Sequence, residues 1–342
     1  MKTVNNILEH RTIGSNCSTT ASKIILNSYG YTYSEDMVLG LGAGLGFIYQ
    51  YYADKEEYFL SGKNESLELN LTHALGGTVL TGSFDDEGRG WQTVKELIDE
   101  DIPVILDLSI RELPYFQPYL KELANIGFGL HNAILVGYDD EKEEVMLLDH
   151  RWSEPQIISY DALRKARGTK EGEGNVGSSR NAYKVLVLDR KGKKPSPEIY
   201  FAIKLNINRM RHPFAFKMGL AGIKTFHDEI KMFFEEGIYQ DKEEAILTFS
   251  YLMEKLGTGG GNFRRMYGRF LNEAAGMTGD ERFRQIAKDY QILAKRWKEL
   301  SVLLGELVTA PQLITEFDRL MKEIEERESA GIDALESLVK EG

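Results

Sequence analysis

The sequence contains a single cysteine, Cys17, among 342 residues. One cysteine cannot form an internal disulfide, which excludes a disulfide-stabilised fold and favours a reducing compartment. Long apolar runs are also missing: no stretch is long enough to predict a transmembrane helix, and the first residues lack the apolar core of a secretory signal. We therefore expect a cytoplasmic protein that does not contact a membrane.

Basic residues are outnumbered, with 42 Lys and Arg against 53 Asp and Glu and a net charge of −11. Such a surface repels a phosphate backbone, so nucleic acid is not an expected partner. The six histidines are scattered, and neither a second cysteine nor an H-E-x-x-H pattern accompanies them. No metal site is predicted.

The chain changes character near residue 190. Before it, buried strands are predicted over 103–108, 132–138, 144–149 and 183–188, with helices over 21–29 and 91–100. After a charged linker over 190–197, the pattern is helical over 222–236, 242–256, 263–275, 281–304 and 311–338. We predict an α+β domain over 1–190 and an all-α domain over 198–342.

Glycine alternates with apolar residues over 37–47. This pattern disfavours both helix and strand. It predicts a loop that packs tightly or lines a site.

Cys17 lies just before the first predicted helix, among polar residues that are unusual around a core cysteine. Free N–H groups and the positive end of the helix dipole stabilise a thiolate at such a position. The same groups could hold an oxyanion. Cys17 is therefore a candidate nucleophile.

His131 and Asp149 lie on the two strands of one predicted hairpin. A loop centred near residue 140 or 141 brings them opposite each other or onto adjoining rungs. Because their numbers sum to an even value, an even-sum register places both side chains on one face, whereas a one-residue slip separates them. A base held by a carboxylate is what a thiol nucleophile requires.

Each of these residues also has an ordinary structural interpretation: an inert core cysteine, a strand histidine and a turn aspartate. Their order along the chain favours a triad of Cys17, His131 and Asp149. Asn132 and His150 are adjacent in sequence, so the orienting group or the base could lie one position away.

The order Cys–His–Asp, with the cysteine at a helix start and the histidine on a strand, resembles papain-fold cysteine peptidases of the bacteriocin-processing kind. The first half resembles more closely the butirosin biosynthesis protein H family, in the stretches 16–21, 34–47 and 131–139. A fourth, 257–271, resembles the uncharacterised helical domain usually fused to it. The resemblance implies a papain-like domain followed by an all-α domain.

The resemblance also implies acyl transfer. The butirosin enzyme moves an aminoacyl group from an acyl-carrier-protein thioester to an amine of an aminoglycoside. Here Cys17 would take the acyl group, His131 would shuttle protons and Asp149 would orient the imidazole. Papain-like peptidases place a glutamine about six residues before the cysteine, where this chain has Arg11. Asn16, or a backbone N–H at the helix start such as that of Ser18, would have to supply the oxyanion donor.

We expect no required cofactor. The donor could be the phosphopantetheine of an acyl carrier protein or coenzyme A, and the acceptor a small-molecule amine. An anion such as the donor's phosphate could bind the glycine loop and following arginines, namely Gly259, Gly260, Gly261, Arg264 and Arg265. A tight turn with exposed arginines is the alternative. The C-terminal helices could also form a homodimer face.

Two other functions fit the same pattern. A cysteine peptidase or amidase would use water as the acceptor and release a free acid. A non-catalytic binding protein on a papain-like scaffold would have an unreactive thiol.

Overall fold

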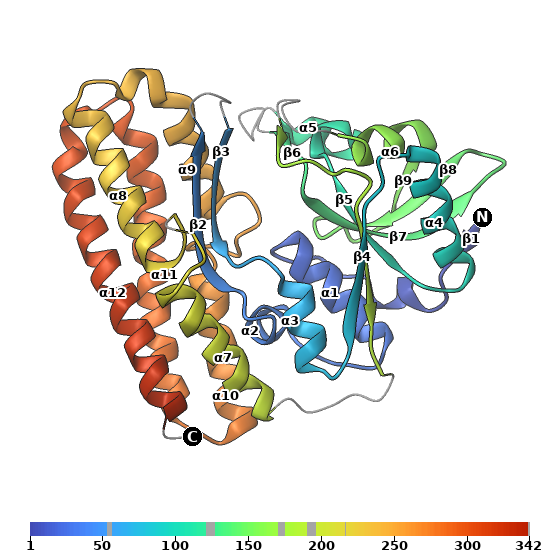
Figure 1. Ribbon diagram of the computed structural model, residues 1–342, viewed down its shortest axis with the longest axis horizontal. Coiled ribbons are helices and arrows are strands. Elements are labelled where there is room, and N and C mark those ends of the chain that lie inside the picture. Colours follow the sequence, from blue (N-terminus) through green and yellow to red (C-terminus); the bar gives the residue numbers. More distant parts are fainter. Residues whose placement is uncertain (53–56, 121–126, 170–174, 190–195, 216, 341–342) are drawn as a thin grey trace. The chain divides into compact units, whose positions relative to one another are not determined.

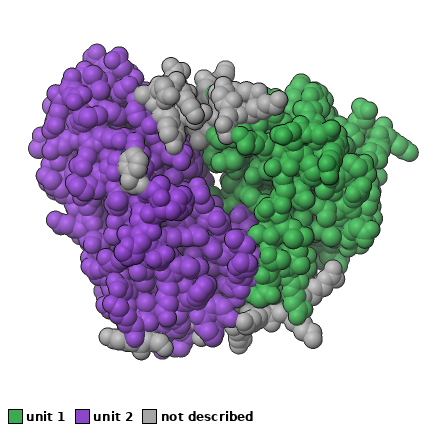
Figure 2. All heavy atoms as spheres, in the orientation of Figure 1, with its two compact units in different colours: residues 1–38, 75–193 green, residues 39–74, 194–342 purple. Residues whose placement is uncertain are grey.

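The computed structural model describes residues 1–52, 57–120, 127–169, 175–189, 196–215 and 217–340 (Figure 1). The chain divides into two compact units, coloured separately in Figure 2. Unit 1 consists of residues 1–38 and 75–193, and unit 2 of residues 39–74 and 194–342. Each unit is described by itself.

Unit 1 is built on an antiparallel sheet with strand order β4-β11-β5-β7-β8-β9, and β1 pairs with the far end of β7. The strands are β1 (Lys2–Thr3), β4 (Thr78–Gly82), β5 (Val104–Leu108), β7 (His131–Asp139), β8 (Glu144–Leu148), β9 (Gln156–Ser159) and β11 (Tyr183–Val187). A second small sheet pairs β6 (Gly127–Phe128) with β10 (Asn175–Val176) in parallel.

The helices of unit 1 are α1 (Cys17–Ser28), α4 (Glu87–Asp99), α5 (Gln117–Leu120) and α6 (Tyr160–Arg167), with 3₁₀ turns at Ile7–His10, Ile110–Glu112 and Pro114–Phe116. Helix α1 packs on β7, α4 packs on β5 and β7, and α6 packs on β5, β8 and β9. The expected mixture of helices and sheet is confirmed in this unit.

Strand β7 lies in the interior of the sheet and carries apolar side chains on both of its faces. Ala133, Ile134, Leu135 and Val136 are all fully buried. A strand covered on both faces reads as a continuous apolar run rather than an alternating one. The same strand begins with His131, so the core of unit 1 fixes the position of that imidazole.

Unit 2 is mainly helical. Its helices are α3 (Leu67–Ala74), α7 (Ser196–Arg211), α8 (Gly219–Glu235), α9 (Glu243–Glu254), α10 (Arg264–Thr278), α11 (Arg282–Leu307) and α12 (Ile314–Lys340), with 3₁₀ turns at Tyr239–Lys242 and Pro311–Leu313. A hairpin of β2 (Leu45–Tyr52) and β3 (Glu57–Lys63) packs against α8 and α9 (Figure 1). Helix α2 (Glu35–Leu41) crosses the boundary between the units.

The division differs from the expected contiguous domains, because residues 39–74 belong with the helical unit. Aromatic packing explains this: the ring of Tyr49 on β2 lies 5.2 Å from that of Phe226 and 5.4 Å from that of Phe249. Most of the predicted linker, at residues 190–195, lies outside the described residues.

The glycine-rich segment 37–47 was wrongly predicted to be a loop, since it forms most of α2 and the start of β2. Its glycines allow close packing: a Cβ atom at Gly40 would lie 2.1 Å from the Phe270 ring, and one at Gly46 would lie 2.3 Å from the Asn64 side chain. In this segment tertiary packing outweighs the low helix and strand propensity of glycine. Within the described part of the chain, none of the helices combines the length and apolar character needed to cross a bilayer.

Candidate active site

Cys17 is the first residue of α1, and its side chain is partly exposed. The helix begins four residues before the predicted start, because Asn16 caps it. The Asn16 Oδ1 atom accepts hydrogen bonds from the Thr19 N–H (3.2 Å) and the Ser18 hydroxyl (2.9 Å). The capping residue thus places the thiol in the first turn, where the helix dipole favours an anion.

Glu35 binds the turn before the thiol, a role that the sequence pattern did not reveal. Its carboxylate accepts hydrogen bonds from the N–H groups of Ser15 (2.9 Å) and Asn16 (2.9 Å). It also accepts from the hydroxyls of Thr19 (2.6 Å) and Thr20 (3.0 Å). One carboxylate therefore binds the backbone before Cys17 and two side-chain hydroxyls after it.

These contacts bear on the predicted support residues Asn16 and Ser18. The backbone N–H of Asn16 is bound to Glu35, its side-chain oxygen caps the helix, and the Ser18 hydroxyl donates to that oxygen. Both residues hold the helix start in place. The oxyanion role expected for them stays a prediction. Arg11 donates instead to the carbonyls of Leu8 and Ser153.

The hairpin of β7 and β8 brings His131 and Asp149 together. Their side chains meet with Nε2 of the imidazole 2.6 Å from Oδ2 of the carboxylate, and both are buried. In this part of the hairpin Ile134 pairs with Leu148, which is the even-sum register. Asp149 and His131 consequently belong to the same sheet face.

A β-bulge produces that register. Near the loop Asp139 pairs with Glu144, an odd-sum register that would have put the two site residues on opposite faces. Between Leu135 and Gly137 the register shifts by one residue, which leaves Val136 as the extra residue on β7. The bulge also lies where β1 pairs with β7, and the Val136 carbonyl accepts the N–H of Val4 at 2.8 Å.

Asp149 accepts hydrogen bonds from more than His131. Its Oδ1 atom lies 3.0 Å from Nδ1 of His150, and its Oδ2 atom accepts the Tyr115 hydroxyl at 3.1 Å. The backbone links this cluster to the thiol turn, because the Gly14 N–H donates to the His150 carbonyl at 2.8 Å. A buried carboxylate satisfied on both oxygens is held in one orientation.

The contact between His131 and Asp149 raises the pKa of the imidazole and lowers that of the carboxylate. Burial alone would lower the pKa of His131, but the charge and hydrogen bond of Asp149, with a smaller contribution from the hydrogen-bonded Cys17 side chain, raise it to about 10. Burial would likewise raise the pKa of Asp149, but the two histidines hold it well below its usual range. At neutral pH the pair is therefore an imidazolium and a carboxylate.

Asn132 and His150, the sequence neighbours of the proposed pair, make different contacts from His131 and Asp149. The Asn132 amide donates to Asp107 Oδ1 at 2.6 Å, and the same oxygen pairs with Lys184 at 3.0 Å, so Asn132 does not orient His131. Burial lowers the pKa of His150. A neutral His150 that binds Asp149 is better suited to support the carboxylate than to act as the base.

A cluster of aromatic rings packs on the imidazole through Phe116. Phe116 meets His131 edge-on, with ring centroids 5.0 Å apart, and Trp152 lies 4.9 Å from Phe116 and 4.8 Å from Tyr115. These rings restrict imidazole rotation and keep water from the His131–Asp149 contact. No sequence pattern predicts these rings at the site, because they come from a 3₁₀ turn and a loop with no periodic pattern.

His131, Asp149 and His150 also form a group that could hold a metal ion, since one ligand atom from each lies within 4.8 Å of the others. The sequence analysis expected no metal site. In each histidine the nitrogen nearest the carboxylate already shares a hydrogen bond with it.

The predicted anion-binding loop contains a carboxylate of the same chain. The Gly261 N–H donates to Glu254 at 2.6 Å, and Arg265 lies 3.8 Å from the same carboxylate. Gly259 and Gly260 adopt positive φ as parts of the turn. This geometry agrees with the alternative of a tight interhelical turn.

Arg264 is fully buried, contrary to its expected place at an exposed anion site. Its Nε atom pairs with Glu328 at 2.6 Å, and its Nη1 atom donates to the carbonyls of Gly62 (3.1 Å) and Asn262 (2.8 Å). It is a core residue of unit 2.

Two family models match the chain. The family described as butirosin biosynthesis protein H, N-terminal, matches residues 16–150, which span the thiol, the imidazole and the carboxylate. A domain of unknown function (DUF4872) matches residues 161–335. The chain belongs to the butirosin biosynthesis protein H-like family, in the form that carries this second domain. No curated protein matches the chain. The DUF4872 match begins inside unit 1. Helix α6 and strand β11 of that unit therefore fall within the DUF4872 match.

Proposed function

We propose that this member of the butirosin biosynthesis protein H-like family is a cysteine-dependent acyltransferase that forms an acyl-enzyme on Cys17 and passes the acyl group to an amine. The observation that carries the proposal is the hydrogen-bonded series from Asp149 through His131 to Cys17. A thiol at a helix start, with a histidine and a carboxylate on an adjoining antiparallel sheet, is also the arrangement of a papain-like fold. We assign that fold to unit 1 as part of the proposal.

In the first half-reaction the Cys17 thiolate attacks the carbonyl carbon of a thioester. A carbon–sulfur bond to Cys17 forms, the bond to the donor sulfur breaks, and the imidazolium of His131 gives its proton to the departing thiol. Since Nε2 of His131 is bound to Asp149, Nδ1 is the nitrogen that remains for this transfer.

In the second half-reaction the acceptor amine attacks the thioester on Cys17. Neutral His131 takes a proton from the amine as the carbon–nitrogen bond forms. The bond to Cys17 then breaks, which restores the thiolate and the imidazolium. His131 accepts the proton that the amine releases, so this scheme needs no cofactor.

Asp149 orients the imidazole and stabilises its protonated form. Tyr115 and His150 in turn hold the carboxylate. Such support fixes both the tautomer and the ring orientation, which is the function of the third member of a triad.

We propose transfer to an amine rather than hydrolysis because the chain belongs to this family. The donor in the proposal is a thioester of phosphopantetheine, on an acyl carrier protein or as coenzyme A. The loop at residues 257–261 is not included as its phosphate site, because the Glu254 carboxylate already accepts the Gly261 N–H.

The proposal is tested by intact-protein mass spectrometry with acetyl-coenzyme A and longer acyl-coenzyme A thioesters. We expect one acyl group per chain, removable by hydroxylamine and absent from Cys17→Ser. Addition of a primary amine should then discharge the acyl group as an amide. Discharge to free acid without an amine would instead identify an amidase or peptidase, and an unmodified thiol with every donor would favour a binding protein.

A further inference from the structure

Arg167, at the end of α6, is a buried cation that forms no ion pair with any carboxylate of the described residues. Its side chain is 2% exposed, and its Nη2 atom donates to the Gly90 carbonyl at 3.1 Å. Its Nε atom has no hydrogen-bond partner among the described residues. Burial lowers the pKa of this guanidinium to about 10, with no contribution from a nearby carboxylate. An uncompensated buried charge is costly and points to a missing partner.

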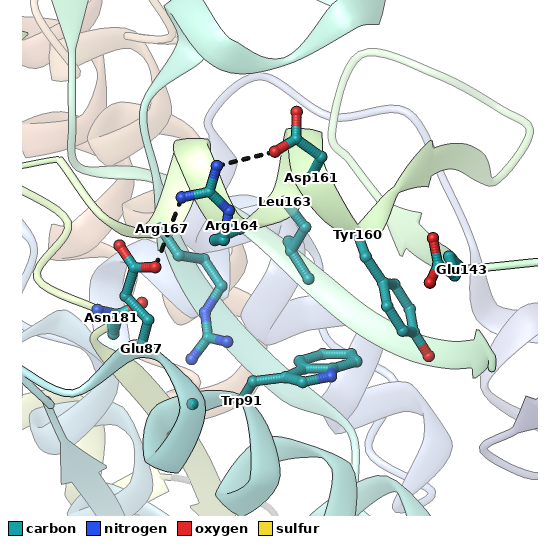
Figure 3. A pocket seen from close by; sticks show the side chains of 10 residues that line it. Glu87, Trp91, Glu143, Tyr160, Asp161, Leu163, Arg164, Arg167 and Asn181 are labelled. Carbon is teal, nitrogen blue, oxygen red and sulfur yellow. Dashed lines mark hydrogen bonds and ion pairs between the residues drawn. The ribbon is translucent and has the colours of Figure 1, made fainter.

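The side chain of Arg167 reaches a cavity of about 390 Å³ between α4 and α6 (Figure 3). The volume falls in the range of small-molecule sites. Leu163 and Asn181 form the buried part of its wall with Arg167, and Trp91 and Tyr160 supply aromatic surface. The ring centroids of these two aromatic residues lie 4.9 Å apart.

The charges around the cavity restrict what could enter. Glu87, Asp161 and Glu143 line it together with Arg164 and Arg167. Arg164 is already paired with Asp161 (2.8 Å) and Glu87 (3.5 Å), as the dashed lines of Figure 3 mark. The lining thus carries three negative and two positive charges, which disfavours a doubly charged phosphate and leaves one buried cation to be neutralised.

We propose that this cavity binds a small monocarboxylate with an apolar body, whose carboxylate pairs with Arg167 and whose body contacts Trp91. A planar carboxylate matches the guanidinium fork. None of the lining residues belongs to the Cys17, His131 and Asp149 site, so the proposal is independent of the proposed acyl transfer. The first family match supplies the α4 side of the cavity and the second supplies most of the α6 side.

The test uses the full chain labelled with 5-fluorotryptophan, because its three tryptophans report three places. Trp91 lines the cavity, Trp152 contacts Phe116, the ring that meets His131, and Trp297 belongs to unit 2. The probe is 3-phenylpropionate, and its amide, 3-phenylpropanamide, is the uncharged control. We expect a saturable shift of the Trp91 fluorine resonance with the acid and none with the amide. No Trp91 shift, or equal shifts with acid and amide, would overturn the proposal.

Two variants separate binding from folding. Arg167→Met should weaken binding of the probe roughly tenfold to hundredfold, as expected for loss of a charged hydrogen bond. If Arg167→Met does not fold, Gly88→Leu tests the proposal, because it narrows the cavity and keeps Arg167. A Cβ atom at position 88 can be accommodated, since its nearest neighbouring atom would be 3.4 Å away. The control Arg89→Met, at an exposed position of α4 outside the cavity lining, should change affinity by less than about threefold. Unaltered binding in Gly88→Leu would overturn the proposal.

Discussion

The imidazole of His131 and the carboxylate of Asp149 lie 2.6 Å apart because one bulged residue in β7 changes the register of their hairpin. Without that bulge the two side chains would belong to opposite faces of the sheet. The candidate active site therefore depends on an irregularity of the fold as much as on the residues themselves.

Replacing Asp149 with Asn should disable the site while leaving its shape. The amide cannot stabilise the imidazolium and favours the wrong tautomer, so we expect the acylation rate to fall by roughly a hundredfold to ten-thousandfold. The measurement is the single-turnover rate of acyl-enzyme formation. Asp107→Asn is the matched control, because Asp107 lies near the site but pairs with Asn132 and Lys184. Equal losses in the two variants would refute a specific role for Asp149.

Glu35→Gln should loosen the turn that carries the thiol. The amide group of Gln is a donor, so it would oppose the N–H groups of Ser15 and Asn16. We expect a loss of about 1–3 kcal/mol in the free energy of unfolding, together with slower reaction of Cys17. Asp86→Asn, which changes a capping carboxylate on α4, should cost less than about 1 kcal/mol and leave the thiol unaffected. A Glu35→Gln protein with wild-type thiol reactivity would contradict this role.

The pair should also make stability depend on pH. The pKa of His131 is about 10 in the folded chain, against about 6.5 in an unfolded one. A raised pKa contributes stability that is complete below about pH 6.5 and is lost as the pH rises towards 10. The lowered pKa of Asp149 contributes stability above its ordinary pKa of 3.8, which is lost as the pH falls.

We therefore expect the difference in unfolding free energy between wild type and His131→Gln to shrink between about pH 6 and pH 10. Chemical denaturation at a series of pH values measures it. A difference that grows with pH would mean that His131 is buried as the neutral imidazole.

Part of this arrangement was predictable from the sequence. The sequence predicts Cys17, His131 and Asp149 because a thiol nucleophile needs a base and a carboxylate, and because the register of a hairpin shows which residues share a sheet face. The sheet strands followed from apolar runs such as the one in β7. These are local signals that a sequence shows directly.

The rest depends on contacts between residues distant in sequence. Glu35 and Tyr115 approach the site only in the folded chain, and neither belongs to a periodic pattern. The alternating glycines suggested a loop, yet Gly40 is needed where the Phe270 ring approaches a helix. The sequence predicts an exposed Arg264, because its ion-pair partner, Glu328, is 64 residues away and no local pattern links the two.

The Arg264–Glu328 pair should matter for unit 2 alone. Arg264→Ala leaves a buried carboxylate and the Trp297 N–H that binds it, so we expect a loss of about 3–5 kcal/mol in the free energy of unfolding. Arg265→Ala, at a partly exposed position, should cost less than about 1 kcal/mol. Similar losses in the two variants would show that the buried pair is not the source of stability.

The rate at which iodoacetamide alkylates the native protein between pH 5 and pH 9 tests the central claim most directly. With one cysteine in the chain, every labelled molecule reports on Cys17. We predict fast alkylation that persists well below the ordinary thiol pKa of about 8.5 and that is lost in His131→Ala. Slow alkylation that follows an ordinary thiol titration, unchanged in the variant, would contradict a thiolate–imidazolium pair and with it the proposed acyl transfer.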